Sequence, residues 1–452
     1  MVSKWNKMKT ITKNDSRQMA EVPTVAVIGL GFVGSSVAAA WLRSGAQVWG
    51  YDASKKRVDS LEGLSFDSEE NIINAFKDGL KSANLSLASK VSEELREADT
   101  KIICVPVYLG SDHKADLSYL KAAATTVATN LKKGDAVIIC PSVPPGTTRK
   151  VVKPILEGSS KLEAGVDFDL IYSPERIYVG RALQDIEERY PAIISGINDA
   201  SITRAEELFT KIAKKGVLKM PSIEAAEFEK LAEGVFRDVN IALANELALI
   251  CDDQGIDFWS VREAANTQPF CNIHTPSLGV GGACIPVYPW FVVESAKRNE
   301  AILTREGRRI NDSMVDWLVD FLKKNYNLNH DTRIAILGLA FRGDIADSRL
   351  SVTYRLFQKL KDEKVRKIIV HDPIIDYDPV IGGSLISEIG VALSDCDIAI
   401  IATDHSYYRR LNWMALSNSE NSLKIIDCRG VLRDVSIPGV EIYGLGYGKK
   451  KN

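Results

Sequence analysis

Short apolar runs alternate with longer helical stretches over residues 22–218 of the chain. This alternation is typical of parallel strands joined by crossover helices. The sequence therefore predicts an open α/β sheet in the first half of the chain. Its predicted strands are residues 25–28, 47–51, 101–105, 136–140, 169–172 and 192–195.

A helical pattern replaces this alternation after Ser222, because apolar residues then recur near helical spacing. Gly255 follows Gln254, the last helical position, and is suited to a helix C-cap. We predict one long helix here that connects two domains. The apolar residues that define it are Phe228, Leu231, Val235, Val239, Leu243 and Ile250.

The alternation of strands and helices resumes after Asp331, with predicted strands at 333–337, 367–371, 397–401 and 423–427. Residues 334–341 also repeat the pattern of residues 25–32, with Ala340 in place of Gly31. We therefore expect an α/β protein with two doubly wound Rossmann-like domains, joined by a helical central domain. Because the second copy lacks one glycine, we expect it to bind something other than a dinucleotide pyrophosphate.

Length and composition are those of an ordinary multidomain enzyme. A chain of 452 residues exceeds the size at which one hydrophobic core stops growing. Its formal net charge of −2 provides no basic field, so neither nucleic acid nor a membrane surface is an expected partner. The seven cysteines include no C-x-x-C pair, which favours reduced thiols in the cytoplasm and no metal site. The expected boundaries are a basic, disordered tail at 1–21 and domains at 22–218, 219–330 and 331–452.

A glycine cluster follows the first predicted strand. Residues 22–42 carry no charge over a length that could cross a bilayer, but a strand, a glycine turn and a helix explain them better. Gly29, Gly31 and Gly34 have the spacing of a turn that lets a pyrophosphate approach the backbone at a helix N-terminus. The alternative is a structural turn without a ligand.

Asp52 ends the next predicted strand, where a carboxylate can accept hydrogen bonds from the adenosine ribose. Its negative charge would repel a 2′-phosphate, so NAD is favoured over NADP. The neighbouring cations Lys55, Lys56 and Arg57 weaken that preference. With the glycine cluster, Asp52 predicts a dinucleotide site.

A loop rich in glycine and proline surrounds Cys284, with Gly281 and Gly282 before it and Pro286 after it. Bare backbone in such a loop can approach a ligand closely. A thiol there can add to an aldehyde, lose hydride to a nicotinamide and leave a thioester for water to hydrolyse. The alternative is a small buried side chain, which is the commoner use of cysteine.

Lys230, Gly234 and Arg237 are four and seven residues apart, which places them on one face of the long helix. A lysine that faces a closed site stabilises oxyanions or transfers protons, whereas the alternative is a solvated helix face. Glycine inside a helix costs about 1 kcal/mol relative to alanine, so we expect a close approach to the backbone at Gly234.

Glu175 and Ser142 each come just after a predicted strand. The carboxyl ends of parallel strands are where open α/β sheets bind their ligands, so both side chains are candidates for the site. Alternatively, either one caps a following helix.

In combination, these motifs resemble the UDP-glucose and UDP-N-acetylmannosamine dehydrogenase family over essentially the whole chain after the tail. Several motifs occur in order, which makes the resemblance specific. Arg176, the Arg-Asp-Val-Asn segment and the Cys-Ile-Pro segment are more similar to the N-acetylhexosamine branch than to the glucose branch. The motifs are GLGFVG (29–34), ICVP (103–106), SPER (173–176), FRDVNIALANEL (236–247), GVGGACIPV (279–287) and GLAFRGD (338–344).

The resemblance implies an NAD-binding first domain, a dimer-forming helical middle with the cysteine loop, and a C-terminal domain that holds a UDP-sugar. It implies a cytoplasmic homodimer or larger homo-oligomer that makes precursors of surface polysaccharides or glycans. The implied reaction is a four-electron oxidation of the sugar C6 hydroxyl to a uronic acid, in which two NAD molecules are used in turn. UDP-N-acetyl-D-mannosamine is the expected substrate.

The resemblance also assigns residues by position. Cys284 matches the nucleophile, Lys230 a proton-transferring lysine, and Glu175 a carboxylate that assists water or proton transfer. The implied NAD contacts are Gly29, Gly31, Phe32, Val33, Gly34, Asp52, Arg57, Val107, Ser142 and Arg349. The implied substrate contacts are Arg176, Tyr178, Val179, Arg237, Gly281, Phe341 and Arg342.

Three positions depart from the family pattern. The family usually has asparagine where this chain has Gly234, aspartate where it has Tyr288, and an interface arginine where it has Phe270. The first two leave open how water is held for thioester hydrolysis, and the third how the sugar nucleotide is clamped.

Two rival interpretations remain at the level of sequence. A two-electron β-hydroxyacid dehydrogenase would share the glycine turn and the inward lysine, but would need neither Cys284 nor a second α/β domain. A non-catalytic NAD sensor would keep the glycines and be indifferent to Lys230 and Cys284.

Overall fold

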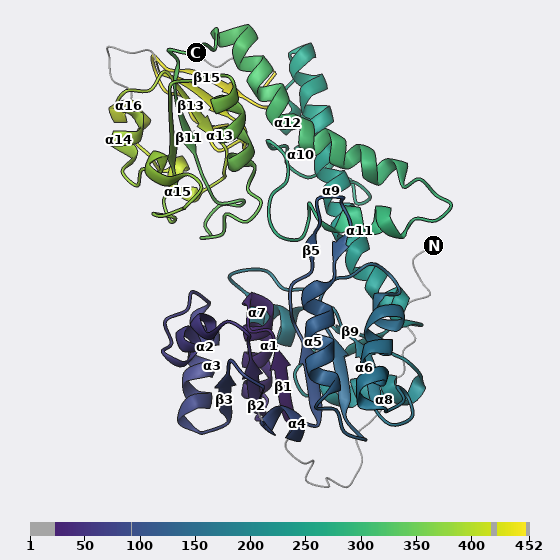
Figure 1. The fold of residues 1–452 in the computed structure, drawn as a ribbon. Helices are drawn as coiled ribbons and strands as arrows, with labels where there is room; N and C mark the ends of the chain where they lie inside the picture. Colours follow the sequence, from purple (N-terminus) through teal and green to yellow (C-terminus); the bar gives the residue numbers. More distant parts are fainter. Residues whose placement is uncertain (1–22, 92, 417–422, 449–452) are drawn as a thin grey trace.

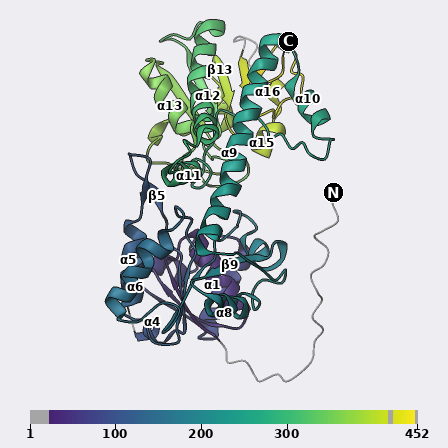
Figure 2. The same cartoon turned by 90° about the vertical axis from the view of Figure 1, so that its right-hand side faces the viewer.

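The computed structural model describes residues 23–91, 93–416 and 423–448. The basic tail expected at 1–21 lies outside the described residues. Two α/β regions lie at opposite ends of a long helix, α9 (Ile223–Gln254), as Figures 1 and 2 show from two sides. The predicted arrangement of two α/β domains joined by a helical middle is confirmed.

The N-terminal region is built on an eight-stranded sheet in the order β10-β9-β8-β7-β4-β1-β2-β3, parallel except between β8 and β9. All six predicted strands are present within two residues of their predicted ends. The sequence pattern does not predict the edge strands β3 and β10, because both are short and largely uncovered. The strands are β1 (Thr24–Ile28), β2 (Gln47–Tyr51), β3 (Leu85–Ala88), β4 (Thr100–Ile103), β7 (Ala136–Ile139), β8 (Asp169–Tyr172), β9 (Ala192–Gly196) and β10 (Val217–Lys219).

Helices cover both faces of this sheet. Val25 and Val27 of β1 belong to one hydrophobic cluster, with residues of α1, α3 and α8, and Ala26 and Ile28 to another, with residues of α4, α5 and α6. This alternation gives a doubly wound sheet. The helices and turns are α1 (Phe32–Arg43), α2 (Lys55–Glu62), α3 (Glu70–Lys81), α4 (Glu93–Glu97), α5 (Ser118–Ala128), η1 (Thr148–Val152), α6 (Lys153–Ser160), α7 (Ala182–Gln184), η2 (Asp185–Arg189) and α8 (Asp199–Phe209).

The long helix α9 begins and ends as the sequence predicts. The Ser222 side chain accepts a hydrogen bond from the Ala225 amide at 3.1 Å, and Gly255 ends the helix with a φ of 70°. A second long helix, α12 (Ile302–Tyr326), packs along it and is not among the predicted elements. No helix within the described ranges is both long and apolar enough to cross a membrane. The other central helices are α10 (Phe258–Ala265) and α11 (Tyr288–Ser295).

A buried polar network joins α9 to α12. The Arg308 guanidinium lies 2.6 Å from the Asp238 carboxylate, and the Asn311 amide donates to the same carboxylate at 2.9 Å. Removing one partner of such a network would leave a buried charge uncompensated. The network therefore fixes how the two helices, and the domains they carry, face one another.

A small hairpin of the N-terminal region, β5 (Tyr108–Leu109) and β6 (Ala115–Asp116), reaches the central helices. Its tip packs on α11, where the His113 and Trp290 rings stack with centroids 4.2 Å apart. The Ala115 amide also donates to the Glu294 carboxylate at 2.9 Å. The helix after Cys284 is thus held by the N-terminal region as well as by α9.

The C-terminal region contains a five-stranded parallel sheet in the order β12-β11-β13-β14-β15. The four predicted strands are present, and the edge strand β15 is an addition. The strands are β11 (Arg333–Leu337), β12 (Lys367–His371), β13 (Ile398–Ile401), β14 (Lys424–Asp427) and β15 (Glu441–Gly444). The helices are α13 (Val352–Asp362), η3 (Gly382–Ser384), α14 (Ile389–Leu393), α15 (Ser406–Arg409) and α16 (Trp413–Leu416).

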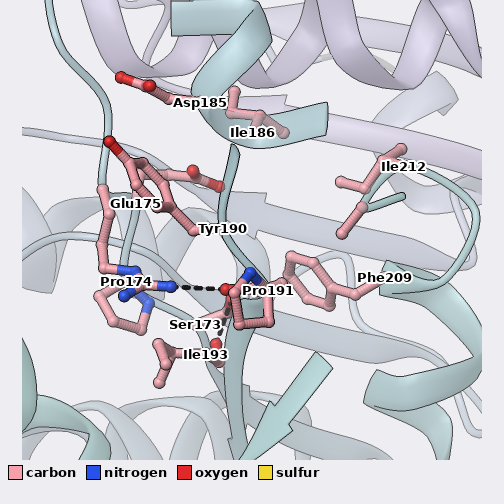
Figure 3. A pocket seen from close by; sticks show the side chains of 13 residues that line it. Ser173, Pro174, Glu175, Asp185, Ile186, Tyr190, Pro191, Ile193, Phe209 and Ile212 are labelled. Atoms are coloured by element: carbon pink, nitrogen blue, oxygen red, sulfur yellow. Dashed lines mark hydrogen bonds between the residues drawn. The ribbon is translucent and has the colours of Figure 1, made fainter. Parts of the chain in front are cut away.

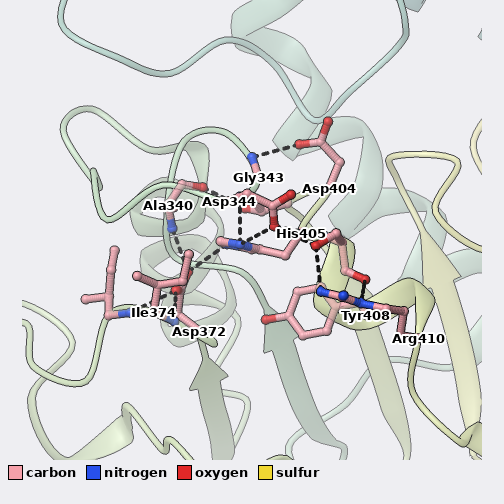
Figure 4. Close-up of polar contacts among 12 residues, drawn as sticks. Ala340, Gly343, Asp344, Asp372, Ile374, Asp404, His405, Tyr408 and Arg410 are labelled. Atoms are coloured by element: carbon pink, nitrogen blue, oxygen red, sulfur yellow. Dashed lines mark hydrogen bonds and ion pairs between the residues drawn. The ribbon is translucent and has the colours of Figure 1, made fainter. Parts of the chain in front are cut away.

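Asp372 follows β12 as Asp52 follows β2, but its carboxylate is used inside the domain. It accepts hydrogen bonds from the amides of Leu339 at 2.8 Å and Ala340 at 2.9 Å, and lies 3.1 Å from Nε2 of His405 (Figure 4). Burial alone would raise the pKa of Asp372, but these hydrogen bonds outweigh it and hold the pKa at about 2. The second copy of the fold therefore presents no free carboxylate for a ribose at this position.

Candidate active site

The glycine turn between β1 and α1 has the shape that a pyrophosphate needs. Gly29 has a φ of 89°, and a Cβ at Gly34 would lie 1.8 Å from the Gly29 carbonyl oxygen. Gly31 caps α1 without a side chain, and a Cβ there would meet nothing within 4 Å. The helix N-terminus is therefore open to an anionic ligand, and the residues fit a dinucleotide.

Asp52 supports this turn directly. Its Oδ2 atom accepts from the Leu30 amide at 2.9 Å, and the Arg57 Nε atom donates to the Leu30 carbonyl at 2.7 Å. Lys55 is paired with Asp59 at 2.9 Å. Two of the three cations that weaken the preference for NAD are thus engaged by the protein itself. Phe32 and Val33, the first residues of α1, lie half-buried beside the turn.

Cys284 is exposed and stands just before α11, where its carbonyl oxygen accepts the Val287 and Tyr288 amides at 3.0 Å. The alternative of a small buried side chain is therefore wrong. The glycines before it leave room for a side chain of the C-terminal domain. A Cβ at Gly281 would lie 2.8 Å from the Phe341 side chain, and one at Gly282 would lie 3.0 Å from it. Bare backbone here is approached by the C-terminal domain.

The C-terminal domain holds the cysteine loop at a second point. The Gly282 amide donates to the Arg349 carbonyl at 2.9 Å. The Arg349 guanidinium is paired with Asp347 at 2.6 Å and is near enough to Cys284 for their charges to interact. Arg349 therefore belongs to the surroundings of the cysteine.

Lys230 faces inward, with its side chain 14% exposed and its Nζ atom 3.3 Å from Glu233. The interpretation as a solvated helix face is wrong. Burial raises the pKa of Glu175 to about 7, and the charges of Lys230 and Arg176 oppose that rise. Arg176 lies 3.3 Å from Glu233 and donates to the Pro191 carbonyl at 2.5 Å. Glu175 and Arg176 line a small pocket at the end of β8 (Figure 3).

Ser142 and Glu175 do not cap helices. The next turns of helix begin at Thr148 and Ala182 without a side-chain cap. Instead, the Ser142 hydroxyl donates to the Tyr288 hydroxyl at 2.9 Å. Tyr288 in turn packs on α9, because a Cβ at Gly234 would lie 2.5 Å from its ring. The close approach expected at Gly234 is made by Tyr288, so two of the departures from the family pattern are one contact.

Three arginines surround the Tyr178 ring. The guanidinium carbons of Arg181, Arg237 and Arg342 lie 4.7, 5.3 and 5.6 Å from its centroid. Arg342 also donates to the Val179 carbonyl at 3.1 Å. Burial, together with the charges of Arg342 and Arg429, lowers the pKa of Arg237. No ion pair of Arg237 occurs among the described residues, so this cluster is suited to an anionic ligand.

Glu227 is a residue that the sequence did not single out. It is buried on α9, one turn before Lys230, and accepts the amides of Gly146 at 2.5 Å and Thr148 at 2.8 Å. Burial raises its pKa to about 7. Glu227 fastens the loop that carries Ser142 to the helix that carries Lys230. Nothing in its local sequence distinguishes it from a surface glutamate.

One face of α9 connects these groups. Lys230 lies near Glu175, Gly234 lies against Tyr288 beside the cysteine loop, and Arg237 lies over Tyr178. Val107 packs against the apolar cluster that contains Tyr288. Among the described residues, no group of three His, Cys, Asp or Glu side chains could hold a metal ion. The fold and site are those of a dinucleotide-dependent oxidoreductase with an exposed thiol beside an arginine-lined anion site.

Comparison with known proteins shows which family of oxidoreductases the chain belongs to. Three models of the UDP-glucose/GDP-mannose dehydrogenase family match the chain: the NAD binding domain at residues 23–213, the central domain at 224–313 and the UDP binding domain at 335–434. The chain therefore belongs to the UDP-glucose/GDP-mannose dehydrogenase family and is an NAD-dependent nucleotide-sugar dehydrogenase.

Individual relatives agree with this assignment. The chain is 34% identical to a UDP-N-acetyl-D-mannosamine dehydrogenase of Pyrococcus horikoshii, with 94% of this chain and 99% of the relative covered. A solved UDP-D-ManNAc dehydrogenase from that organism superposes with a TM-score of 0.86 at 33% identity, over 94% of this chain and 99% of the other. A UDP-glucose dehydrogenase from Pyrobaculum islandicum has the same TM-score, 0.86, at 25% identity, over 96% and 100%. The shape of the fold therefore does not distinguish the sugars.

Because Gly234 contacts Tyr288, a glycine-to-alanine substitution that normally stabilises a helix should destabilise this protein. Alanine is normally about 1 kcal/mol more stable than glycine inside a helix. Because the added Cβ would overlap the Tyr288 ring, Gly234→Ala should instead lower the free energy of unfolding by about 1–3 kcal/mol in urea denaturation. Gly158→Ala in α6, where a Cβ meets nothing within 4 Å, is the matched control. Equal stability of the two variants would contradict the contact.

Proposed function

We propose that the protein oxidises the C6 hydroxyl of UDP-N-acetyl-D-mannosamine to a carboxylate, through a thiohemiacetal and a thioester on Cys284. The proposal rests on three side chains that lie on one side of α9: the exposed Cys284, the inward Lys230 and the unpaired Arg237. The product would be a nucleotide-linked uronic acid, a precursor of surface polysaccharides or glycans. Its dependence on a free thiol suits the reducing cytoplasm.

The covalent steps follow from the chemistry of a thiol and an aldehyde. NAD supplies the hydride acceptor for each of the two oxidations. After the first, the Cys284 sulfur adds to the aldehyde carbon, and the carbonyl oxygen gains a proton to give the thiohemiacetal. The second oxidation removes a hydride and that proton, which leaves the thioester. Water then adds to the acyl carbon, the C–S bond breaks, and the acid and the free thiol are released.

Lys230 and Glu175 are suited to the proton transfers of this sequence. The lysine carries a positive charge beside the site, where it would stabilise the oxyanion of the thiohemiacetal and of the hydrolysis step. Glu175 has a pKa of about 7, so it can accept a proton from water or from an alcohol and return it near neutral pH.

The arginines around Tyr178 are suited to the diphosphate of the sugar nucleotide. Arg237 comes from α9, Arg342 from the C-terminal domain and Tyr178 from the loop after β8, so an anion between them would touch all three regions. Guanidinium groups bind phosphate oxygens through paired hydrogen bonds. Binding here would direct the sugar toward Cys284, because Phe341, the residue before Arg342, packs on Gly281 and Gly282.

The choice of N-acetylmannosamine rests on the relatives, several of which are named UDP-N-acetyl-D-mannosamine dehydrogenase at 31–34% identity. UDP-glucose or another UDP-N-acetylhexosamine is the alternative substrate, because N-acetylhexosamine epimers differ only in the orientation of one ring substituent and glucose differs in having a hydroxyl in place of the acetamido group. The rate of NADH formation with a panel of UDP-sugars decides between them. A kcat/KM for UDP-glucose above that for UDP-N-acetyl-D-mannosamine would overturn the choice.

We also propose that two copies of the chain pair through α9. Phe236, Leu243 and Ile250 stand seven residues apart and are 58%, 43% and 46% exposed. A stripe of large apolar side chains on one helix face is typical of an interface. Phe270, 92% exposed in the loop after α10, lies where the family has an interface arginine.

Cys284→Ala should remove carboxylate formation and leave NAD binding unchanged, because the glycine turn does not depend on the thiol. Cys271→Ala, a cysteine in a different loop, is the control and should keep its activity. The uronic acid is measured by mass spectrometry and NAD binding by titration calorimetry. Acid formed at the parental rate by Cys284→Ala would rule out the covalent role.

The raised pKa of Glu175 predicts a pH profile. If Glu175 acts as a base, kcat/KM should rise with pH through about 7, where the carboxyl group loses its proton. Glu175→Gln should flatten this limb and lower the rate by about 10²–10⁴-fold. Glu207→Gln, on the exposed face of α8, should keep the parental profile. A Glu175→Gln enzyme with an unchanged inflection near 7 would contradict the assignment.

Arg237→Gln should weaken the sugar nucleotide selectively. Loss of one charge-assisted contact to phosphate should raise the KM for the UDP-sugar by about tenfold or more and leave the KM for NAD unchanged. Arg309→Gln, on an exposed face of α12, serves as the control. An equal effect on both KM values would show that Arg237 supports the fold and not the substrate.

The proposed interface predicts that the parent protein is at least dimeric in size-exclusion chromatography with light scattering. The double variant Phe236→Glu, Leu243→Glu places two charges in the stripe and should give monomers, with circular dichroism as the check on folding. A monomeric parent at micromolar concentration would contradict the interface.

A further inference from the structure

A loop of the C-terminal domain, residues 338–344, carries two side chains of the candidate site. Phe341 packs on the glycines before Cys284, and the Arg342 guanidinium lies 5.6 Å from the centroid of the Tyr178 ring. The loop follows β11 and belongs to no helix or strand. Its shape therefore depends on bonds that its backbone makes outside the ladder of the sheet.

One carboxylate–imidazole pair holds this loop on both sides of its two site residues (Figure 4). Before them, the amides of Leu339 and Ala340 donate to Oδ2 of Asp372 at 2.8 and 2.9 Å. After them, the Asp344 amide donates to Nδ1 of His405 at 3.0 Å. The other ring nitrogen, Nε2, lies 3.1 Å from the same oxygen of Asp372. The two ends of the loop thus meet on one pair of side chains.

These bonds determine where the ring of His405 carries its proton. Because Nδ1 accepts from a backbone amide, the proton lies on Nε2, which donates it to the Asp372 carboxylate. The other polar groups that face the ring have partners of their own. The Asp344 carboxylate accepts the Ser406 amide at 2.9 Å, and the Tyr408 hydroxyl donates to a backbone carbonyl at 3.0 Å. The buried imidazole is therefore a neutral bridge between the carboxylate and the far end of the loop.

The alternative is a buried polar pair that serves only the stability of the domain. Oδ1 of Asp372 fits that role, since it accepts two amides of the turn that follows it. Oδ2 and His405 do not, because their backbone partners all lie in the loop. Thr403 adds a bond to the same loop, since its hydroxyl donates to the Ala340 carbonyl at 2.7 Å. Three side chains that follow β12 and β13 are thus directed at the loop that carries Arg342.

We propose that Asp372, Thr403 and His405 are positioning residues for the sugar nucleotide. By holding loop 338–344, they keep the Arg342 guanidinium where the diphosphate binds, so that little further ordering is needed when the ligand arrives. None of the three contacts the ligand, and their effect on binding is exerted through Arg342. The inference rests on the proposed binding of the diphosphate by the arginines around Tyr178.

The positioning role is tested by the affinity of the full-length protein for UDP, measured by titration calorimetry without NAD or sugar. His405→Gln replaces the donor at Nε2 and loses the acceptor at Nδ1, whereas His405→Asn replaces the acceptor and loses the donor. We expect each variant to raise the Kd for UDP by about three- to tenfold, the effect of losing one hydrogen bond. The Kd for NAD should not change, because the glycine turn lies in the other α/β domain.

A double-mutant cycle separates positioning from a general loss of stability. If His405 acts through Arg342, His405→Gln should weaken UDP binding in the parent and have little further effect in Arg342→Gln, because the charge that it positions is already gone. The matched control is His330→Gln. His330 is exposed and precedes β11, at the opposite end of the strand from the loop, so this variant should keep the parental affinity.

Thr403→Val keeps the shape of the side chain, removes its bond to Ala340 and leaves the histidine in place, so a smaller rise in the Kd for UDP is expected. Additive effects of His405→Gln and Arg342→Gln overturn the proposal, and so does a parental UDP affinity in the His405 variants. If neither His405 variant folds, a parental affinity in Thr403→Val overturns it. A parent protein that does not bind UDP would instead contradict the arginine site on which the inference rests.

Discussion

The packing of the Tyr288 ring on the bare backbone of Gly234 is the contact on which the arrangement of the site depends. Any side chain at position 234 would push the ring away, and with it the first turn of α11 and the loop that carries Cys284. The same ring receives the Ser142 hydroxyl from the NAD-binding region. The contact at Gly234 thus holds the cysteine loop, the central helix and the end of β7 in fixed positions relative to one another.

Helix α9 also positions the other polar groups of the site. Lys230 faces Glu175 one turn before Gly234, and Arg237 faces the anion site about one turn after it. Glu227 ties the loop of Ser142 to the beginning of the same helix. Because α12 holds α9 through the buried pair of Arg308 and Asp238, the C-terminal domain is placed on the same frame. Each domain contributes to a site that none of them contains alone.

The two α/β domains share a sequence pattern but use the acidic residue that follows the second strand of the pattern in different ways. In the first, the acidic residue after β2 supports the glycine turn and lies half-buried beside it. In the second, Asp372 is buried and accepts hydrogen bonds from four backbone amides besides its contact with His405, and Ala340 stands in the place of the second glycine. The strand–turn–helix unit therefore forms an open turn suited to a dinucleotide in the N-terminal domain. In the C-terminal domain, the polar groups of the same unit are bound by the protein itself.

Much of the fold and part of the candidate site could be predicted from the sequence. The features that could not be predicted were missed for physical reasons. Strands buried on both faces appear as continuous apolar runs, whereas β3, β10 and β15 at sheet edges have too few covered positions to stand out. Cys284, Lys230 and Glu175 became candidates only when their motifs were taken together in order, because the local sequence around each one also fits a structural role. By contrast, Gly234 and Tyr288 are 54 residues apart and looked like two separate losses, since only the packed structure shows that one accommodates the other. Glu227 gave no local signal, because its importance comes from two amides 79 and 81 residues away.

The central claim is that one thiol carries the substrate through two successive oxidations. The most direct test is to incubate the protein with NAD and UDP-N-acetyl-D-mannosamine and to count the NADH formed per sugar nucleotide consumed. Two NADH per sugar nucleotide and a carboxylate product are expected. One NADH per sugar nucleotide with a free aldehyde would contradict the covalent role of the thiol in two oxidations.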